Sequence, residues 1–329
     1  MRRRTLLAAT ATALAPGPLG AQPQKRDGVR RLGVLMGGEA SDPLWKGLAD
    51  IFVKSLADRG WRDGDNLRVD WRWAGDGSAI DRSASELVAL KPDAIFCQTS
   101  PATAALRRAT STIPIIFVRV TDPIGQGLVT NLAHPGGNVT GFTNFEASVG
   151  GKWLELLKEA APSVTHITLL FNPQTAPFAE NYLHAAQAAA QTLGVSVTPA
   201  PSTSTAELEA AVAATAATPG GGIIAMFDTF LAEHRDFLVA LVIRYRLPAI
   251  YGSQIFVPSG GLMSYASNYP DIFRRAADYV DRILRGTRPG DLPVQEPAKF
   301  TLSVNLKAAT AIGLALPQSL ITRADEVVE

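Results

Sequence analysis

The sequence predicts an α/β protein made of two doubly wound parallel-sheet lobes joined by a hinge. Strand-like apolar runs form a series that occurs twice, helix-length stretches separate most consecutive runs, and a turn-rich segment follows each series. The first series is Arg31–Met36, Leu67–Trp73, Asp93–Thr99 and Ile113–Val120. The second series is Thr165–Asn172, Val195–Pro199, Gly222–Asp228 and Leu247–Tyr251. Two lobes of one design imply a cleft between them.

Helical spacing is clearest just after the first run. Four large apolar residues fall on one face there, namely Trp45, Leu48, Phe52 and Leu56. Ser41-Asp42-Pro43 supplies a cap and a first-turn proline, and Gly60 a stop. Further helices are predicted over Ser78–Leu90, Pro101–Thr110, Ala179–Leu193, Thr205–Ala217, Tyr269–Arg285 and Asn305–Leu314. Because a parallel strand pair needs a crossover long enough to hold a helix, this alternation predicts parallel sheets.

The order of the runs predicts how the chain divides. Residues 1–21 are expected to be an export signal, 28–140 plus 266–290 the first lobe, and 141–265 plus 291–329 the second. Two turn-rich segments, Asn131–Gly141 and Gly260–Tyr265, are expected to connect the lobes. The helix Tyr269–Arg285 then returns to the first lobe, and a strand Phe300–Val304 crosses back to the second.

Composition narrows the class of protein. Hydrophobic residues make up 47% and charged residues 19% of 329, which is enough for two filled cores. The formal charge is +1, and without Arg2, Arg3 and Arg4 it becomes −2, from 28 basic and 30 acidic residues. A nucleic-acid partner, which needs a basic face, is therefore not expected.

The first residues have the three parts of an export signal. Arg2-Arg3-Arg4 is basic, Leu6–Ala15 is apolar but too short to span a bilayer, and Leu19-Gly20-Ala21 offers small residues for cleavage. Either the twin-arginine or the general secretory route fits. The one cysteine, Cys97, lies inside an apolar run, so neither an internal disulfide nor a lipid anchor near the cleavage site is expected. The expected location is the periplasm, as a soluble monomer.

Ligands of open parallel sheets bind beyond the carboxyl ends of the strands, near the point where strand order reverses. This rule selects ten candidate ligand-binding residues at the ends of the predicted strands: Gly38, Glu39, Thr99, Ser100, Thr121, Asp122, Asn172, Asp228, Thr229 and Ser253. They are small, hydroxyl-bearing, amide or acidic residues, which suit a small zwitterion. Ser100 at a helix N-terminus could hold a carboxylate, and Asp122 or Asp228 an ammonium group.

Three of these assignments, and a possible ligand contact by Trp45, have a structural alternative. Ser100 is as well suited to capping its helix as to binding a ligand. Asp122 precedes Pro123, which slightly favours a turn over a ligand contact. Asp228 could also cap a helix, yet its position makes it the strongest candidate contact. Trp45 could stack on a ligand, but its place on the apolar helix face favours core packing.

Catalytic and metal-binding motifs are not found in the sequence. It contains no G-x-S-x-G elbow, P-loop or complete dinucleotide fingerprint. Its four histidines, His134, His166, His184 and His234, show no metal-ligand spacing. No catalytic residue, metal or cofactor is therefore expected.

Several stretches together resemble one protein family. They are Arg59–Leu67, Val120–Gly125, His134–Gly141, Gly261–Tyr265, Asn268–Asp271 and the tail Asn305–Lys307 with Ala324–Val327. The chain resembles the substrate-binding proteins of ABC transporters that include the tryptophan/tyrosine-binding type. The family position matching His134 is often arginine. The resemblance covers nearly the whole chain after the leader.

The resemblance implies a type I periplasmic-binding fold with three crossovers between lobes that close over a ligand. It also implies delivery of an amino acid, aromatic ones included, or a similar small organic solute to an ABC permease and its ATPase in the inner membrane. Two alternatives stay open. One is a secreted hydrolase acting in the same cleft, and the other is a ligand-presenting partner of a membrane sensor.

Overall fold

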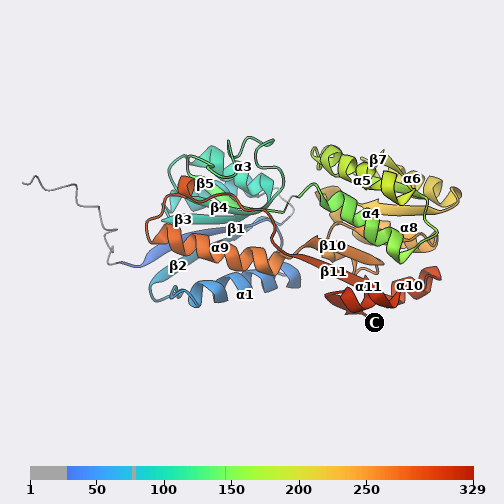
Figure 1. Cartoon of the computed structure of the whole chain (residues 1–329). Helices are drawn as coiled ribbons and strands as arrows, with labels where there is room; N and C mark the ends of the chain where they lie inside the picture. The colour runs from blue at the N-terminus through green and yellow to red at the C-terminus, as the bar shows by residue number, and fades with distance from the viewer. Residues whose placement is uncertain (1–27, 76–78, 145) are drawn as a thin grey trace, which may run out of the picture.

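The chain folds into two α/β lobes that lie side by side in a computed structural model (Figure 1). The structure describes residues 28–75, 79–144 and 146–329, so the expected export signal lies outside the described residues. No helix in these ranges is long and apolar enough to cross a membrane. The predicted α/β class with two parallel-sheet lobes is confirmed.

The first lobe is a five-stranded parallel sheet in the order β2-β1-β3-β4-β5. Its strands are β1 (Arg30–Met36), β2 (Leu67–Trp73), β3 (Ala94–Gln98), β4 (Ile115–Val120) and β5 (Val139–Thr143). Its helices are α1 (Pro43–Ala57), α2 (Ile80–Ala89), α3 (Ser100–Ala109) and α9 (Tyr269–Leu284). Helices α1 and α9 lie together on one face, and α2 and α3 cover the other (Figure 1).

The second lobe repeats this order and extends it. Its sheet runs β12-β11-β10-β9-β8-β6-β7, in which β10 and β11 are antiparallel. The strands are β6 (His166–Phe171), β7 (Ser196–Pro201), β8 (Gly221–Ala225), β9 (Ala249–Tyr251), β10 (Met263–Ser267), β11 (Phe300–Asn305) and β12 (Glu326–Val328). In both lobes the first strand lies between the second and the third, so strand order reverses beside β1 and beside β6.

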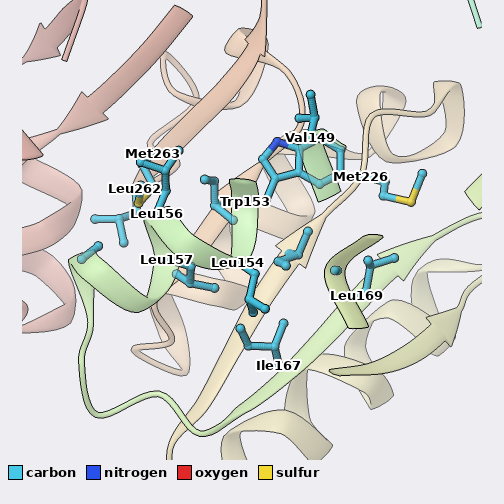
Figure 2. Packing of buried hydrophobic residues seen from close by; sticks show 14 of the residues in the cluster. Val149, Trp153, Leu154, Leu156, Leu157, Ile167, Leu169, Met226, Leu262 and Met263 are labelled. Atoms are coloured by element: carbon cyan, nitrogen blue, oxygen red, sulfur yellow. The ribbon is translucent and has the colours of Figure 1, made fainter. Parts of the chain in front are cut away.

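Helices also cover both faces of the second sheet. They are α4 (Val149–Ala160), α5 (Ala179–Leu193), α6 (Thr205–Ala217), α7 (Thr229–Glu233), α8 (Arg235–Arg244), α10 (Leu306–Ile312) and α11 (Gln318–Arg323). Helices α4 and α5 pack on one face, and α6 and α8 on the other. Figure 2 shows Trp153 of α4 beside Val149 within the first of these buried clusters.

Sequence patterns dictate most of these elements. In β3 and β4 every residue is buried, as expected for strands covered on two faces. Asp42 caps α1 by accepting a hydrogen bond from the Leu44 amide at 2.8 Å, and Pro43 opens that helix as predicted. Cys97 is fully buried, as its apolar surroundings predict.

The two predicted connections were wrong. Asn131–Gly141 leads into β5, which pairs with β4, and Gly260–Tyr265 leads into β10, which pairs with β9. Turn-forming residues mark where the chain bends, but β5 and β10 begin within these segments and alternate apolar with polar or small residues, so neither forms a continuous apolar run. The limits predicted for the lobes stay a prediction; the first sheet extends to Thr143, and Leu292 packs in a core of the first lobe.

The lobes are joined by three connections, which follow β5, follow β10 and precede β11. Hydrogen bonds hold them to one another. The Asn268 amide donates to the Lys299 carbonyl at 2.9 Å, and Ser267 Oγ donates to the Asn144 carbonyl at 3.3 Å. The three connections therefore lie side by side, at the same edge as the carboxyl ends of the strands.

Candidate functional site

A pocket between the lobes is the candidate binding site. Seven of its thirteen lining residues are aromatic. The thirteen lining residues are Thr121 and Tyr269 from the first lobe, the connecting residue Asn144, and Val149, Trp153, Phe178, Tyr182, Phe227, Gly252, Tyr265, Ala266, Ser267 and Phe300. Because both lobes contribute, a change in the angle between them would open or close the pocket.

The aromatic wall is built mainly on α4, α5 and β10. Trp153 stacks on Tyr182 with ring centroids 5.0 Å apart, and its indole nitrogen donates to the Tyr265 carbonyl at 2.7 Å. Tyr265 in turn stacks on Phe300 at 5.3 Å. Burial raises the pKa of Tyr182, so its hydroxyl stays neutral at physiological pH. The wall thus presents ring faces and neutral hydroxyls.

A glycine lets this wall approach the strand ends. A Cβ added to Gly252, which follows β9, would lie 2.9 Å from a ring carbon of Trp153 and 2.9 Å from the Phe227 amide nitrogen. Only glycine fits between them. The cavity between these residues is about 20 Å³, which has room for about one water molecule. A solute the size of an amino acid enters only when rings or lobes move apart.

Arg119 lies directly beside the pocket with its charge unpaired. Its guanidinium carbon is 4.4 Å from the ring centroid of Trp45, 4.5 Å from that of Tyr269 and 5.3 Å from that of Phe227. The residue is 7% exposed. Among the described residues no carboxylate lies within 4.0 Å of it, and its buried Nε has no hydrogen-bond partner.

The backbone at the end of β4 is strained in a way that positions this side chain. The pairing of β4 with β5 shifts register between Val118 and Val120, and Arg119 has φ +57°. Thr99 and Asp122, at the ends of β3 and β4, also have positive φ, at +83° and +45°. Non-glycine residues with such angles concentrate at functional sites.

In the first lobe, Thr121 is the predicted residue that lines the pocket, and its hydroxyl donates to Asn144 Oδ1 at 2.9 Å. Asp122 forms the favoured turn, accepting from the Gly125 amide at 2.9 Å. Ser100 Oγ accepts from Gln126 Nε2 at 3.1 Å. Glu39 is exposed.

Gly38 has a packing role. A Cβ there would come within 2.2 Å of Trp45, so the absence of a side chain lets that ring lie against the end of β1. The expected core packing of Trp45 is confirmed, since it packs against a buried cluster of the first lobe. The same ring also stacks on Arg119.

In the second lobe, the carboxylate of Asp228 already accepts hydrogen bonds from neighbouring residues of the protein. Asp228 is 2% exposed and caps α7, accepting from the Leu231 amide at 2.7 Å, the Asn172 amide at 2.9 Å and Thr175 Oγ1 at 3.2 Å. Burial raises the pKa of Asp228, while these donors oppose the shift. Asp228 is not among the pocket-lining residues, and its role in ligand binding stays a prediction.

Three other predicted residues of the second lobe differ in exposure. Asn172 is buried and its Oδ1 accepts from the Gln174 amide at 2.8 Å. Thr229 is exposed on the first turn of α7. Ser253 is fully buried, and its Oγ has no hydrogen-bond partner among the described residues.

A second hollow of about 240 Å³ lies along α9, beside Phe142 of β5. It also has arginines, but these are paired, Arg59 with Asp278 at 3.7 Å and Arg275 with Asp271 at 3.7 Å. No cluster of three or more potential metal ligands occurs in residues 28–75, 79–144 and 146–329. The pocket between the lobes is therefore the better candidate site.

Comparison with known proteins agrees with this geometry. The sequence model of the family "ABC transporter substrate binding protein" matches residues 34–328. A tyrosine-binding protein of Clostridioides difficile (strain R20291) is 27% identical over 269 residues, covering 80% of this chain and 75% of that protein.

Two solved structures are similar over nearly their whole length. An ABC domain in complex with L-Trp from Streptococcus pneumonia is 26% identical, with TM-score 0.79, covering 91% of this chain and 100% of that one. A ligand-free, open substrate-binding protein with adhesive properties from Clostridium difficile is also 26% identical, with TM-score 0.75, covering 92% of this chain and 99% of the other.

Proposed function

We propose, from the premise that this chain belongs to the family of ABC transporter substrate-binding proteins, that it is the solute-binding subunit of an importer. Its ligand is an amino acid, with aromatic amino acids first among them, or a similar small organic solute. The observation that carries this proposal is the aromatic pocket lined by residues of both lobes. The family consists of solute-binding proteins rather than enzymes.

The lining chemistry supports an apolar or aromatic solute with a polar end. Phe178, Tyr182 and Phe227 offer ring faces, whereas Thr121 and Asn144 place polar atoms at the hinge side of the same pocket. One similar structure holds L-Trp, and one relative is a tyrosine-binding protein. Their ligands are therefore the first to test.

The proposed partners are an ABC permease and its ATPase in the inner membrane, to which the protein delivers its solute as a soluble periplasmic monomer. Lobe closure on the ligand would bury the pocket and distinguish loaded from empty protein for the permease.

A thermal-shift screen of the purified protein tests the proposal. The panel comprises the twenty L-amino acids, nucleobases and small organic acids. A true ligand at about 100 times its dissociation constant should add about 2.7 kcal/mol to the free energy of unfolding. A panel in which no compound stabilises the protein would contradict capture of this class of solute.

A matched pair of phenylalanine variants locates the site. Phe227 lines the pocket, whereas Phe237 on α8 is 38% exposed and lies outside it. Phe227→Ala should weaken binding of the best compound at least about tenfold, because a ring contact is worth about 1 kcal/mol beyond its buried area. Phe237→Ala should leave the affinity unchanged. Equal effects from the two variants would move the site elsewhere.

A further inference from the structure

We infer that Arg119 binds a carboxylate group of the solute and makes that acid group a requirement for capture. This inference rests on the proposed function and adds the chemical group that the site selects. It concerns a residue that lies beside the pocket rather than among its lining, and that the strand-end rule did not select.

The charge of Arg119 is buried and has no acidic partner among the described residues. Arg119 is only 7% exposed as a residue and its Nε is fully buried, and arginines as buried as this are normally paired with a carboxylate. Here its neighbours are three ring faces at 4.4 to 5.3 Å. Ring faces attract a cation but accept none of its N–H groups in the manner of an oxygen. Among the described residues, therefore, no oxygen accepts a hydrogen bond from the Arg119 Nε.

A neighbouring strand end supports the same conclusion. Gln98, at the end of β3, is 1% exposed, and its Oε1 accepts from the Gly37 amide at 3.3 Å. This bond fixes the amide orientation, and the Nε2 group is left buried without a partner in the described residues. Two adjacent strands thus end in buried donors that lack acceptors. An acceptor oxygen from a ligand would satisfy either donor.

Acids near the pocket do not supply those oxygens. Asp122 Oδ1 accepts from the Gly125 amide, and both oxygens of Asp228 accept bonds within the second lobe. Glu146 accepts from Ser148 Oγ. None of these carboxylates forms an ion pair with Arg119. Because a planar guanidinium matches a carboxylate in two parallel hydrogen bonds, a carboxylate is the acceptor that fits.

The test compares four acids with their carboxamides, which lack the carboxylate charge, on the full protein by calorimetric titration. The pairs are L-tryptophan, L-tyrosine, L-leucine and indole-3-acetate, each with its carboxamide. At least one acid should bind, and its amide at least about tenfold more weakly, since a hydrogen bond to a charged group contributes about 1.5–3 kcal/mol. An amide that binds as tightly as its acid would overturn the inference and leave the proposed function intact. If no probe binds, the best ligand from the thermal-shift panel takes their place, and a best ligand that has no carboxylate would overturn this inference and leave the proposed function intact.

Variants separate recognition from a structural role. Arg119→Gln should reduce the preference for acid over amide to about one, and Arg119→Lys should restore part of it, because lysine keeps the charge but not the paired geometry. The matched control is Arg285→Gln. Arg285 also lies over a ring, 5.5 Å from the centroid of Trp61, but its charge is paired with Asp281. This variant should not change the preference. A purely structural Arg119 would weaken acid and amide alike, and an unchanged preference in Arg119→Gln would overturn the inference.

Discussion

Two charged residues at strand ends, Asp228 in the second lobe and Arg119 in the first, differ in whether the folded protein already satisfies them. In the second lobe Asp228 caps α7 and accepts three hydrogen bonds from its neighbours. In the first lobe Arg119 and Gln98 have buried donors without partners in the described residues. A polar residue at a strand end is therefore a structural group or a binding group according to its hydrogen-bond partners, and its position alone does not decide.

The largest expected effect tests the aromatic wall that the second lobe contributes. Trp153→Ala should lower the free energy of unfolding by about 3–5 kcal/mol, because it empties a buried site and removes the bond to the Tyr265 carbonyl. Trp153→Phe, which keeps a ring, should cost less than half as much. Denaturant unfolding monitored by circular dichroism measures both. A loss below about 1 kcal/mol in Trp153→Ala would show that the wall is not part of the core.

The next effect tests whether Asp228 is structural. Asp228→Ala should cost about 2–4 kcal/mol of stability, from a lost helix cap and buried amides left without an acceptor. Ligand affinity of the folded variant should change less than about threefold, because Asp228 does not line the pocket. A threefold change is under 1 kcal/mol. Asp236→Ala, at a carboxylate with a 78% exposed side chain, is the control. A large loss of affinity with unchanged stability would restore Asp228 as a ligand contact.

A smaller effect on stability tests the first lobe. Gln98→Leu removes the unpaired Nε2 together with the bond to Gly37, so the two changes should nearly cancel, within about 1 kcal/mol. Affinity for a carboxylate solute should still fall about tenfold, since one donor is lost. Calorimetry on the variant measures the affinity, and unfolding in the absence of ligand measures the stability. Strong destabilisation with normal affinity would place Gln98 with Asp228 as a structural residue.

The smallest effect concerns Ser100, whose Oγ accepts from Gln126 near the surface. Ser100→Ala should change stability by no more than about 0.5 kcal/mol, as exposed substitutions usually do. It should also leave affinity for a carboxylate nearly unchanged, since Arg119 is the proposed anchor. A tenfold loss of affinity in this variant would transfer that role to the N-terminus of α3.

Regular patterns allowed much of the fold to be predicted. All eight predicted runs are strands, and the long helices lie where spacing and caps placed them. Strands β5 (VTGFT) and β10 (MSYAS) were missed because polar and small residues interrupt them, whereas β3 and β8, of the same length, are nearly continuous apolar runs. The helix α4, which carries Trp153, was also missed, since no strand-like run preceded it in the repeat.

The candidate site was less predictable for a physical reason. The strand-end rule led to Thr121 at the pocket and to Asp228 near it, but it favours polar residues and so passed over Phe227, the residue before Asp228. Arg119 was hidden inside an apolar run, where strand alternation gave no sign of a register shift. Whether a charge has a partner depends on contacts between residues far apart in sequence, which no local pattern contains.

The three adjacent connections have a mechanical consequence. Connections that are hydrogen-bonded to one another resist sliding of the lobes but permit rotation. We therefore expect the second lobe to rotate relative to the first about an axis along these connections. Val120, next to Arg119, pairs with Thr143, which immediately precedes the first of these links. Arg119 thus lies close to the axis of rotation. Its contacts with Trp45 and Tyr269 of the first lobe would persist during rotation, whereas Phe227 would move away with the second lobe. Each swing would readmit water to the cation and loosen its hold on an anion, so the same rotation that admits a solute would also release it.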